Sequence, residues 1–487
     1  MTFRGDRDKD TVCAVSTPHG VGGISVIRVS GPLTLSIVSK ICAFLPAHPE
    51  SHRVYFGNLT YAQSTNTPGN LEGRQDVIDE VLVTYFKQGK SFTGEEVIEI
   101  SCHGSPLICQ TILGQLVQLG ARPADRGEFT YRAFMNGKLD LVQAESVLSL
   151  IESQSQQAAK LALRQLKGQL SHKLEEIEDD MTWILAHAEA SIDFSTEGIT
   201  VVEDDVVQVR LRKIEASLKE LVATFKVGRL LKDGFRIVLT GLPNVGKSSL
   251  LNTFLEDERA IVTDIPGTTR DVIHGDTSFQ GVKFTFVDTA GLRDEATDLV
   301  ERIGIQKSYE AQNESDVVFF VFDIEKGMGP EEIQILESLD PQKTFILANK
   351  NDRIGGSKPL ETVEKALKNS KFFQKIQDPQ AFFTRRVFFV SALDKKVRSD
   401  VLNELVKEFA DLQVENTVLI SNARHYENLT RALENTQRSQ ALVDQGMGAE
   451  FLALELKESL IAIHETLGKR FDDQIMDRVF KEFCIGK

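Results

Sequence analysis

The chain has 487 residues, more than the ~250–300 at which a single hydrophobic core stops growing, so we expect three modules. Its composition, 41% hydrophobic and 26% charged, is that of a globular protein, and no apolar run approaches the ~20 residues that a membrane span needs. The formal charge of −15 argues against a surface that grips a nucleic-acid backbone over its whole extent, because that affinity comes mainly from Lys and Arg.

The first residues and the cysteines both indicate the cytosol. The segment MTFRGDRDKDTV lacks the apolar stretch of a signal peptide and the acid-poor composition of a transit peptide. The cysteines are odd in number and include no CxxC pair, so we interpret them as reduced thiols. We therefore expect a cytoplasmic protein without a membrane partner, in which any nucleic-acid contact is local or supplied by another protein.

Residues 1–127 have the pattern of an α+β domain. The runs Gly23–Val29, Val77–Phe86 and Val97–Ser101 have strand composition, and glycines lie between them. Over residues 128–228 the pattern changes to long amphipathic helices. The apolar residues at helical spacing are Leu163, Leu166, Leu170, Leu174, Ile177, Met181, Leu185 and Ala188.

Residues 229–400 have the pattern of an α/β domain. The strand-like runs are Phe235–Thr240, Lys283–Val287, Val317–Phe322, Thr344–Ala348 and Arg386–Val390. Their alternation with polar segments of helix length favours a mostly parallel sheet with helices on both faces. Helical spacing returns in residues 401–487. The simplest fold is a discontinuous all-helical domain interrupted by the α/β domain, although two separate helical domains give the same pattern.

A phosphate-binding loop lies at the start of the α/β domain. The segment from Gly241 to Ser248, GLPNVGKS, matches GxxxxGK[ST] between the strand-like FRIVLT and the helix-like SSLLNTFL. In such loops backbone N–H groups surround the β-phosphate, Lys247 reaches the β- and γ-phosphates, and the Ser248 hydroxyl binds magnesium. The alternative is a Gly-rich turn beside a buried strand, but a chance match rarely falls in this strand–loop–helix context.

Three further motifs follow strands in the order expected of a guanine-nucleotide site. DTAG, which begins at Asp288, supplies an acidic residue that holds magnesium through water and a glycine that senses the γ-phosphate. In NKND, which begins at Asn349, the Asp352 carboxylate accepts hydrogen bonds from the N–H groups of guanine, which adenine cannot match. SAL, which begins at Ser391, offers a backbone N–H to the guanine carbonyl. Together they predict a GTPase.

The set GLPNVGKS, IVTDIPGTTRD, DTAG, NKND and SAL resembles that of translation-factor-like, Ras-like GTPases. Thr269 resembles the switch threonine that joins Ser248 on magnesium, whereas Leu292 stands where Ras-like proteins carry a water-positioning Gln. The expected GTP-binding residues are Asn244, Val245, Gly246, Lys247, Ser248, Ser249, Thr263, Asp264, Ile265, Pro266, Gly267, Thr268, Thr269, Asp288, Thr289, Ala290, Gly291, Asn349, Lys350, Asn351, Asp352, Ser391, Ala392 and Leu393.

Over nearly its whole length the chain resembles the MnmE/TrmE family of tRNA-modification GTPases. The segments that carry this resemblance are DTVCAVSTPHGVGGISVIRVSG, SFTGEEVIEISCHG, RGEFTYRAFMNGKLDLVQAESV, LVERIGI, SNARH and the terminal FCIGK. Three positions depart from the family pattern: His19 and Val21 replace Pro and Arg, and Arg126 replaces Pro. We expect these departures to alter local turns.

The resemblance implies a potassium ion in place of an arginine finger when two GTPase domains pair. Its expected ligands are the side chain of Asn244 and oxygens of the loop that contains Thr263, Ile265 and Thr268. Glu301 matches the family's water-orienting acid. The alternatives are a solvated acid at a helix start for Glu301 and a turn-forming residue without an ion contact for Asn244.

The resemblance also implies that the N-terminal domain has a folate-binding fold and binds a tetrahydrofolate derivative. Arg28, Glu99, Lys138 and Lys487 match the family's folate-binding positions, although an Arg in a strand and a Lys beside an Asp are commonly plain ion pairs. Cys484 is a candidate catalytic nucleophile, activated by cations such as Lys481 or Lys487, or a packing residue near a chain end.

For function, the resemblance implies a homodimer that works with an FAD-dependent MnmG/GidA-like partner, as a heterotetramer, on the wobble uridine of certain tRNAs. A group of the carboxymethylaminomethyl or aminomethyl type is added at carbon 5, with the folate as one-carbon donor and GTP hydrolysis driving conformational change. Two other functions remain open, an RNA- or ribosome-assembly switch and a folate enzyme with a regulatory GTPase domain. The CIGK end and the folate-type domain argue against the first of these.

Overall fold

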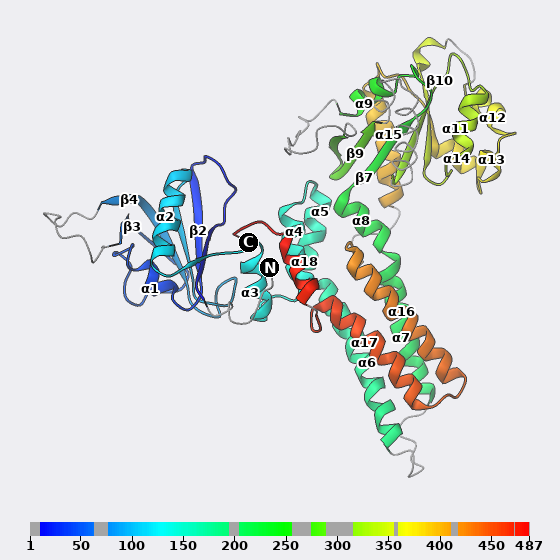
Figure 1. Ribbon diagram of the computed structural model, residues 1–487. Coiled ribbons are helices and arrows are strands. Elements are labelled where there is room, and N and C mark those ends of the chain that lie inside the picture. Colours follow the sequence, from blue (N-terminus) through cyan, green and yellow to red (C-terminus); the bar gives the residue numbers. More distant parts are fainter. Residues whose placement is uncertain are drawn as a thin grey trace, which may run out of the picture. The chain divides into compact units, whose positions relative to one another are not determined.

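The protein is described by a computed structural model that covers residues 10–62, 76–193, 204–255, 274–288, 315–354, 359–410, 417–471 and 473–486 (Figure 1). The chain divides into two compact units. Unit one comprises Met1–Ile151, Leu163–Val222 and Arg424–Lys487, and unit two comprises Glu152–Ala162 and Ala223–Ala423. Because the outer segments of the chain share unit one, the helical domain is a single domain with an insertion, as the simplest interpretation of the sequence predicts.

The N-terminal part of unit one is a six-stranded sheet of order β3-β4-β5-β2-β1-β6. Its strands are β1 (Val12–Val15), β2 (Ile24–Ser30), β3 (Arg53–Thr60), β4 (Val77–Phe86), β5 (Val97–His103) and β6 (Arg122–Pro123). Neighbours are antiparallel except β1 and β6. Alternate residues of β5, such as Ile98 and Ile100, are fully buried in one core with Ile112 of helix α2, whereas Glu99 faces the other side of the sheet.

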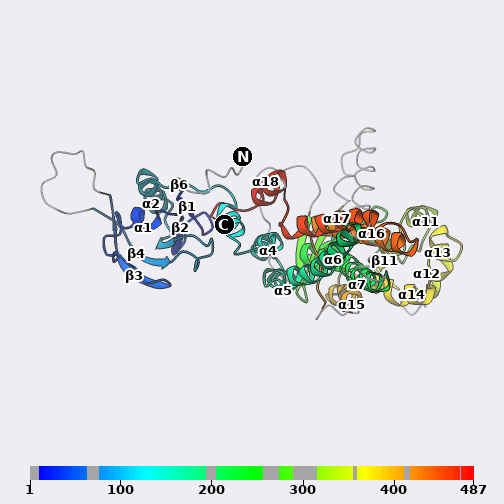
Figure 2. The ribbon, with the colours of Figure 1, turned by 90° about the horizontal axis from the view of Figure 1, so that it is seen from below.

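The rest of unit one is helical. Its helices are α1 (Thr34–Val38) and α2 (Pro106–Gln118) against the sheet, then α3 (Glu128–Met135), α4 (Leu141–Ile151), α6 (Gln169–Asp193), α7 (Asp204–Ala223), α16 (Ala423–Asp444), α17 (Ala449–Leu467) and α18 (Asp473–Lys481). Figures 1 and 2 show α6, α7, α16 and α17 running alongside one another. Helix α5 (Gln156–Leu166) crosses the boundary between the units.

The predicted apolar stripe of α6 is mostly confirmed. Leu170, Leu174, Ile177, Met181 and Ala188 are buried at helical spacing. Ile184 completes the stripe, whereas its predicted neighbour Leu185 is only half-buried. Leu163 is not part of the stripe, because it belongs to the separate helix α5, and it is 43% exposed. Among the helices that the structure describes, none is both long and apolar enough to cross a bilayer.

Unit two is built on a six-stranded sheet of order β12-β11-β10-β7-β9-β8. Its strands are β7 (Phe235–Thr240), β8 (His274–Phe279), β9 (Val282–Asp288), β10 (Val317–Asp323), β11 (Thr344–Asn349) and β12 (Val387–Phe389). All neighbours are parallel except β8 and β9, so the mostly parallel sheet is confirmed. Strand β8, which the sequence did not predict, supplies the antiparallel edge.

Helices cover both faces of this sheet (Figure 1). They are α9 (Lys247–Leu255), α11 (Pro330–Glu337), α12 (Pro359–Leu367), α13 (Lys371–Gln374), α14 (Pro379–Arg386) and α15 (Lys396–Ala410), while α8 (Phe225–Asp233) leads into β7. Phe319 of β10 packs in the core that contains Phe254 of α9, whereas Phe320 packs in the opposite core with Leu336 of α11. Strand β10 is therefore buried on both sides, which explains its continuous apolar sequence VVFFVFD.

Candidate functional site

The phosphate-binding loop runs from the end of the buried strand β7 into α9. Two of its glycines are required by geometry. Gly241 has φ 141°, and a Cβ there would lie 2.1 Å from the carbonyl oxygen of Val321. Gly246 has φ 97°, and a Cβ would lie 2.3 Å from Nδ2 of Asn349. Neither position accepts a side chain, so the loop backbone can lie close to the neighbouring strand ends and to a phosphate.

Lys247 is folded over this loop. Its Nζ donates to the carbonyl oxygens of Gly241 at 3.1 Å and Leu242 at 2.8 Å, and the residue is buried. Ser248 and Ser249 follow it in the first turn of α9 with exposed side chains. The arrangement places an ammonium group, the N-terminal amides of α9 and a hydroxyl at one end of the sheet, a set suited to a phosphate and its cation.

The loop after β11 is joined to the phosphate-binding loop by two hydrogen bonds. Asn349 donates from Nδ2 to the carbonyl of Val245 at 2.8 Å. Lys350 donates from Nζ to the carbonyl of Asn244 at 3.3 Å. Both Lys350 and Asn244 have left-handed backbones with φ 64°. The structure thus brings the predicted base-recognition motif into contact with the predicted phosphate motif.

The third predicted motif, SAL, lies beside the other two. Its neighbour Val390 accepts a hydrogen bond from the Asn351 amide at 3.1 Å, and the carbonyl of Ala392 accepts one from the Thr253 hydroxyl of α9 at 2.9 Å. Asp352, in the 3₁₀ turn η4 (Asn351–Arg353), is exposed. Ser391 accepts a hydrogen bond from the Leu393 amide within its own turn at 3.3 Å, and Leu393 is 87% exposed.

Several predicted site residues lie outside the described part of the chain. These are Thr263, Asp264, Ile265, Pro266, Gly267, Thr268, Thr269, Thr289, Ala290, Gly291, Glu301 and Lys487. The roles of these residues in binding GTP, magnesium, potassium or folate therefore stay predictions. Asp288, which the structure does include, is the last residue of strand β9, whose backbone is parallel to β7.

Asp323 is a residue of this site that no motif predicted. It ends strand β10, its side chain is 4% exposed, and its Oδ2 accepts a hydrogen bond from Lys350 Nζ at 2.6 Å. Burial opposes ionisation of this carboxyl, but the hydrogen bond and charge of Lys350 outweigh burial and hold the pKa of Asp323 below its ordinary value. The only sequence signal is an acid at the end of an otherwise apolar strand.

In the N-terminal sheet, Arg28 and Glu99 are cross-strand neighbours on β2 and β5. Arg28 donates from Nε at 3.0 Å and from Nη2 at 2.8 Å, both to Oε1 of Glu99. The rings of Phe92 and Phe129 lie 5.5 Å and 5.4 Å from the Arg28 guanidinium. The two predicted folate residues thus form an ion pair with each other, while the second carboxylate oxygen of Glu99 receives neither of these bonds. Lys138 is apart from this pair and donates to the Gly89 carbonyl at 2.9 Å.

The C-terminal segment returns to the N-terminal sheet. Ile485 forms an antiparallel bridge with Arg126, and the Cys484 carbonyl accepts from the Gly127 amide at 3.4 Å. Gly486 has φ 92°, and a Cβ there would lie 2.1 Å from the carbonyl oxygen of Val15 at the end of β1. Cys484 is exposed, so its thiol is accessible.

Of the two cations named beside Cys484 in the sequence, Lys481 pairs with Asp477 at 3.3 Å. An ammonium that is already neutralised by a carboxylate is a weaker activator of a nearby thiol.

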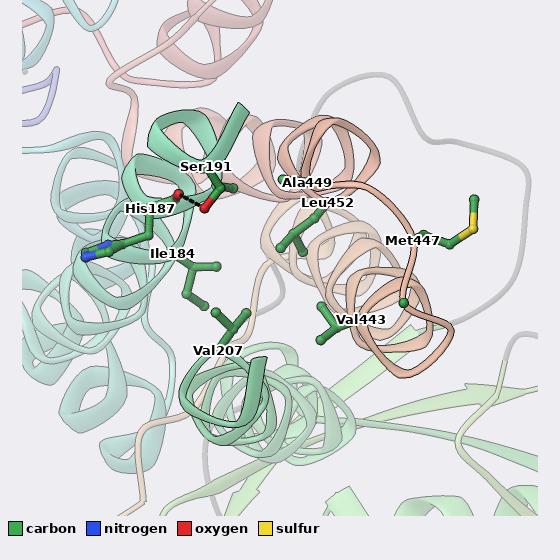
Figure 3. Close-up of a pocket in the computed structure, with 10 residues that line it drawn as sticks. Ile184, His187, Ser191, Val207, Val443, Met447, Ala449 and Leu452 are labelled. Atoms are coloured by element: carbon green, nitrogen blue, oxygen red, sulfur yellow. Dashed lines mark hydrogen bonds between the residues drawn. The ribbon is translucent and has the colours of Figure 1, made fainter. Parts of the chain in front are cut away.

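A cavity of about 150 Å³ lies in the helical part of unit one (Figure 3). It is lined by α6, α7, α16 and α17 with mostly apolar side chains: Ile184, Ala188, Val207, Val443, Met447, Ala449 and Leu452, with His187, Ser191 and Gly446. The His187 ring points away from the other labelled side chains in Figure 3, and its centroid lies 3.8 Å from that of the Trp183 ring, with the two planes tilted by 31°. The cavity contains no predicted site residue.

Comparison with known proteins gives a family that covers the chain. The model described as the GTP-binding protein TrmE N-terminus matches residues 11–138, and that of the MnmE helical domain matches residues 141–484. The tRNA modification GTPase MnmE of Bdellovibrio bacteriovorus is 87% identical over 485 residues, covering 100% of this chain and 99% of that protein. Its namesake from Alkaliphilus metalliredigens is 35% identical over 484 residues, covering 98% and 99%.

Among solved structures, Era in complex with MgGDPNP and nucleotides 1506–1542 of 16S ribosomal RNA is 23% identical, covers 41% of this chain and 66% of that chain, and has a TM-score of 0.28. The assignment rests on the family models and on the full-length relatives. Because these span both the N-terminal sheet and the helical domain with its insertion, the chain belongs to the MnmE family of tRNA modification GTPases.

Proposed function

We propose that this protein is a potassium-dependent GTP hydrolase that modifies carbon 5 of the wobble uridine in certain tRNAs. The observation that carries the hydrolase is the junction of three motif loops at one end of the parallel sheet. Asn349 and Lys350 bind the phosphate-loop carbonyls, and the SAL loop packs on α9. Family membership supports the tRNA substrate, because the relatives that match the whole chain are named tRNA modification GTPases.

The residues present suit the two expected cations. Magnesium and potassium take oxygen ligands, and the exposed hydroxyl of Ser248 and the exposed amide of Asn244 both offer one. Thr269 is expected to join Ser248 at magnesium, and Thr263, Ile265 and Thr268 are expected to join Asn244 at potassium. A potassium ion beside the phosphates offsets charge that develops during hydrolysis, which is the role of an arginine finger. Glu301 would orient the attacking water.

The N-terminal sheet is proposed to hold the one-carbon tetrahydrofolate donor. Glu99 offers its second carboxylate oxygen to the amino and ring N–H groups of a pterin, and Arg28 fixes that carboxylate from the adjacent strand. Lys138 and Lys487 would pair with the anionic glutamate tail. Cys484, exposed in the segment that returns to this sheet, is the proposed nucleophile. A homodimer and an FAD-dependent MnmG/GidA-like partner, together a heterotetramer, would complete the reaction.

The test is GTP hydrolysis by the purified full-length chain in KCl and in NaCl at equal ionic strength. We expect potassium to raise the rate by about 10³-fold or more, the range of an arginine finger. Asn244→Ala should remove the potassium effect and leave GDP binding intact. Equal rates in the two salts contradict the ion mechanism. Loss of all nucleotide binding in Asn244→Ala contradicts an ion-specific role for that residue.

Folate binding is measured separately by calorimetry with 5-formyltetrahydrofolate, because a failure there leaves the hydrolase intact. If potassium stimulates hydrolysis but folate does not bind, the tRNA-modifying reaction needs another one-carbon source. The folate part of the proposal is then wrong.

A further inference from the structure

Asp323 occupies a buried position next to the nucleotide site without belonging to any of its motifs. It is the last residue of β10, between β7 and β11 in the sheet, and those strands lead into the phosphate-binding loop and the base-recognition loop. Both of its carboxylate oxygens are engaged. Oδ1 accepts from the Glu325 amide at 3.1 Å, and Oδ2 accepts from Lys350 Nζ at 2.6 Å.

Lys350 connects Asp323 to the phosphate-binding loop. Its ammonium lies between the buried carboxylate at 2.6 Å and the Asn244 carbonyl at 3.3 Å. A buried carboxylate is costly unless it is paired, so the ammonium is held at the carboxylate rather than in solvent. Because the same ammonium donates to the Asn244 carbonyl, its position fixes the position of that carbonyl.

The backbone is strained at both residues of the Lys350–Asn244 hydrogen bond. Asn244 and Lys350 each have φ 64°, a left-handed conformation that costs non-glycine residues roughly 1–2 kcal/mol and persists where surrounding contacts hold it. At Asn244 the hydrogen bond from Lys350 Nζ to the carbonyl oxygen is such a contact. Removal of the anchor should let this peptide relax, and the Asn244 side chain would move with it.

We propose that Asp323 is a positioning residue of the nucleotide site, which acts through Lys350 to fix the backbone at Asn244. Its first consequence is slow release of bound guanine nucleotide, because the loop keeps the shape that surrounds the phosphates. Its second consequence, which rests on the potassium mechanism proposed above, is that the side chain of Asn244 is held ready for the ion. Occupation of the base-recognition loop and potassium binding are thereby coupled through one lysine.

The test uses Asp323→Asn in the full-length chain, with Glu325→Gln as the matched control. Both variants remove one negative charge near the same loop, but Glu325 is 54% exposed and pairs with Arg353. Release of mant-GDP is followed by stopped-flow fluorescence in NaCl and in KCl. We expect Asp323→Asn to release the nucleotide about tenfold faster than the wild type in both salts, and Glu325→Gln to match the wild type. We also expect Asp323→Asn to need about tenfold more potassium for half-maximal stimulation of hydrolysis.

A double-mutant cycle distinguishes an effect through Lys350 from a general loss of stability in Asp323→Asn. If Asp323 acts through Lys350, Asp323→Asn should add nothing to the release rate of Lys350→Met, whereas independent structural damage adds fully. Additive effects therefore overturn the proposal. So does wild-type release in Asp323→Asn, or equal acceleration by Glu325→Gln. If the wild type itself shows no potassium stimulation, the ion mechanism fails, and the release rates in NaCl still decide the role of Asp323.

Discussion

The Nε2 atom of His425 lies 2.6 Å from Oε2 of Glu145, although the two residues are 280 positions apart in the chain. Glu145 is on α4 and His425 is on α16, so the contact joins helices that precede and follow the inserted α/β domain. Arg424 adds hydrogen bonds to the same carboxylate at 2.9 Å and 3.1 Å. Burial raises the pKa of Glu145, but the charges of His425 and Arg424 outweigh burial and lower this pKa to about 2.

Glu145→Ala should destabilise the helical domain strongly. The change leaves the buried His425 and the Arg424 guanidinium without their carboxylate, and breaking a buried ion pair in this way costs about 3–5 kcal/mol. Hydrogen exchange in peptides of α4 and α16 measures the local loss. Glu189→Ala is the control, because its pair with Lys457 is half exposed and contributes at most about 1 kcal/mol. Equal effects of the two changes would show that the Glu145 ion pairs stabilise the helical domain no more than an exposed pair does.

The same carboxylate predicts acid sensitivity. The pKa of Glu145 is about 2 in the folded protein, against an ordinary value of 4.5. The lowered pKa means that this stabilisation is fully present above pH 4.5 and is lost as the pH falls from 4.5 towards 2. The thermal unfolding temperature of the wild type should therefore fall as the pH is lowered across this window. Glu145→Gln, which starts less stable, should show a flatter pH dependence there, and parallel curves for the two proteins would contradict the assignment.

Gly486→Ala should detach the C-terminal segment from the N-terminal sheet. The new Cβ would lie 2.1 Å from the Val15 carbonyl in a backbone with φ 92°, so the segment must move, at a cost of roughly 1–3 kcal/mol. Hydrogen exchange should rise in the peptide that contains Cys484, while GTP hydrolysis is unchanged because the α/β domain of unit two is untouched.

The control for this change is Gly137→Ala. Gly137 also has a positive φ, 65°, but a Cβ there has nothing within 4 Å, so this variant separates backbone strain from the steric clash. If both variants raise exchange equally at the C-terminus, the contact with Val15 is not what holds the segment.

The sequence predicts elements whose pattern is local. The strands Val77–Phe86 and Phe235–Thr240 have the predicted bounds, because runs of alternating or continuous apolar residues determine them. Strand β3 was not predicted. It is an edge strand whose residues Val54 and Phe56 are 54% and 67% exposed, so burial does not impose an alternating pattern on it.

The site was predicted only as far as motifs extend. GxxxxGK[ST] and NKND mark residues by spacing along the chain, and the structure brings them together at Asn244–Lys350. Asp323 has no motif, because its role arises from the position of β10 between two other strands. The Arg28–Glu99 pair likewise depends on the register of β2 and β5, which sequence spacing does not determine.

Asp352→Asn should change nucleotide preference from GTP to xanthosine triphosphate. The exposed carboxylate in the turn η4 accepts from guanine N–H groups, whereas an amide donates to the extra carbonyl of xanthine. We expect GTP affinity to fall by about 10²-fold or more, since the site then leaves polar groups unpaired. Equilibrium binding of both nucleotides measures the change. Glu325→Gln controls for the lost charge, and a variant that still prefers GTP would show that Asp352 does not bind the base.

Glu99→Gln separates the two accounts of the Arg28–Glu99 pair. If the carboxylate binds the pterin, the amide loses an acceptor that the ligand's N–H groups need, and affinity for 5-formyltetrahydrofolate should fall about tenfold or more. If the residues form only an ion pair, the change lowers stability and leaves folate affinity near the wild-type value. Glu80→Gln is the matched control, because it removes the same charge from an exposed position on the neighbouring strand β4.

Calorimetry with folate and thermal unfolding must be measured on the same preparations, because both accounts include the ion pair and only the pterin account predicts a fall in folate affinity. A fall in affinity that Glu80→Gln does not show assigns Glu99 to the ligand. Arg28→Ala should then weaken folate binding as well, since the guanidinium that fixes Oε1 of Glu99 is lost. Loss of stability in both variants, with folate affinity equal to that of Glu80→Gln, would reduce the pair to a cross-strand contact worth about 1 kcal/mol or less.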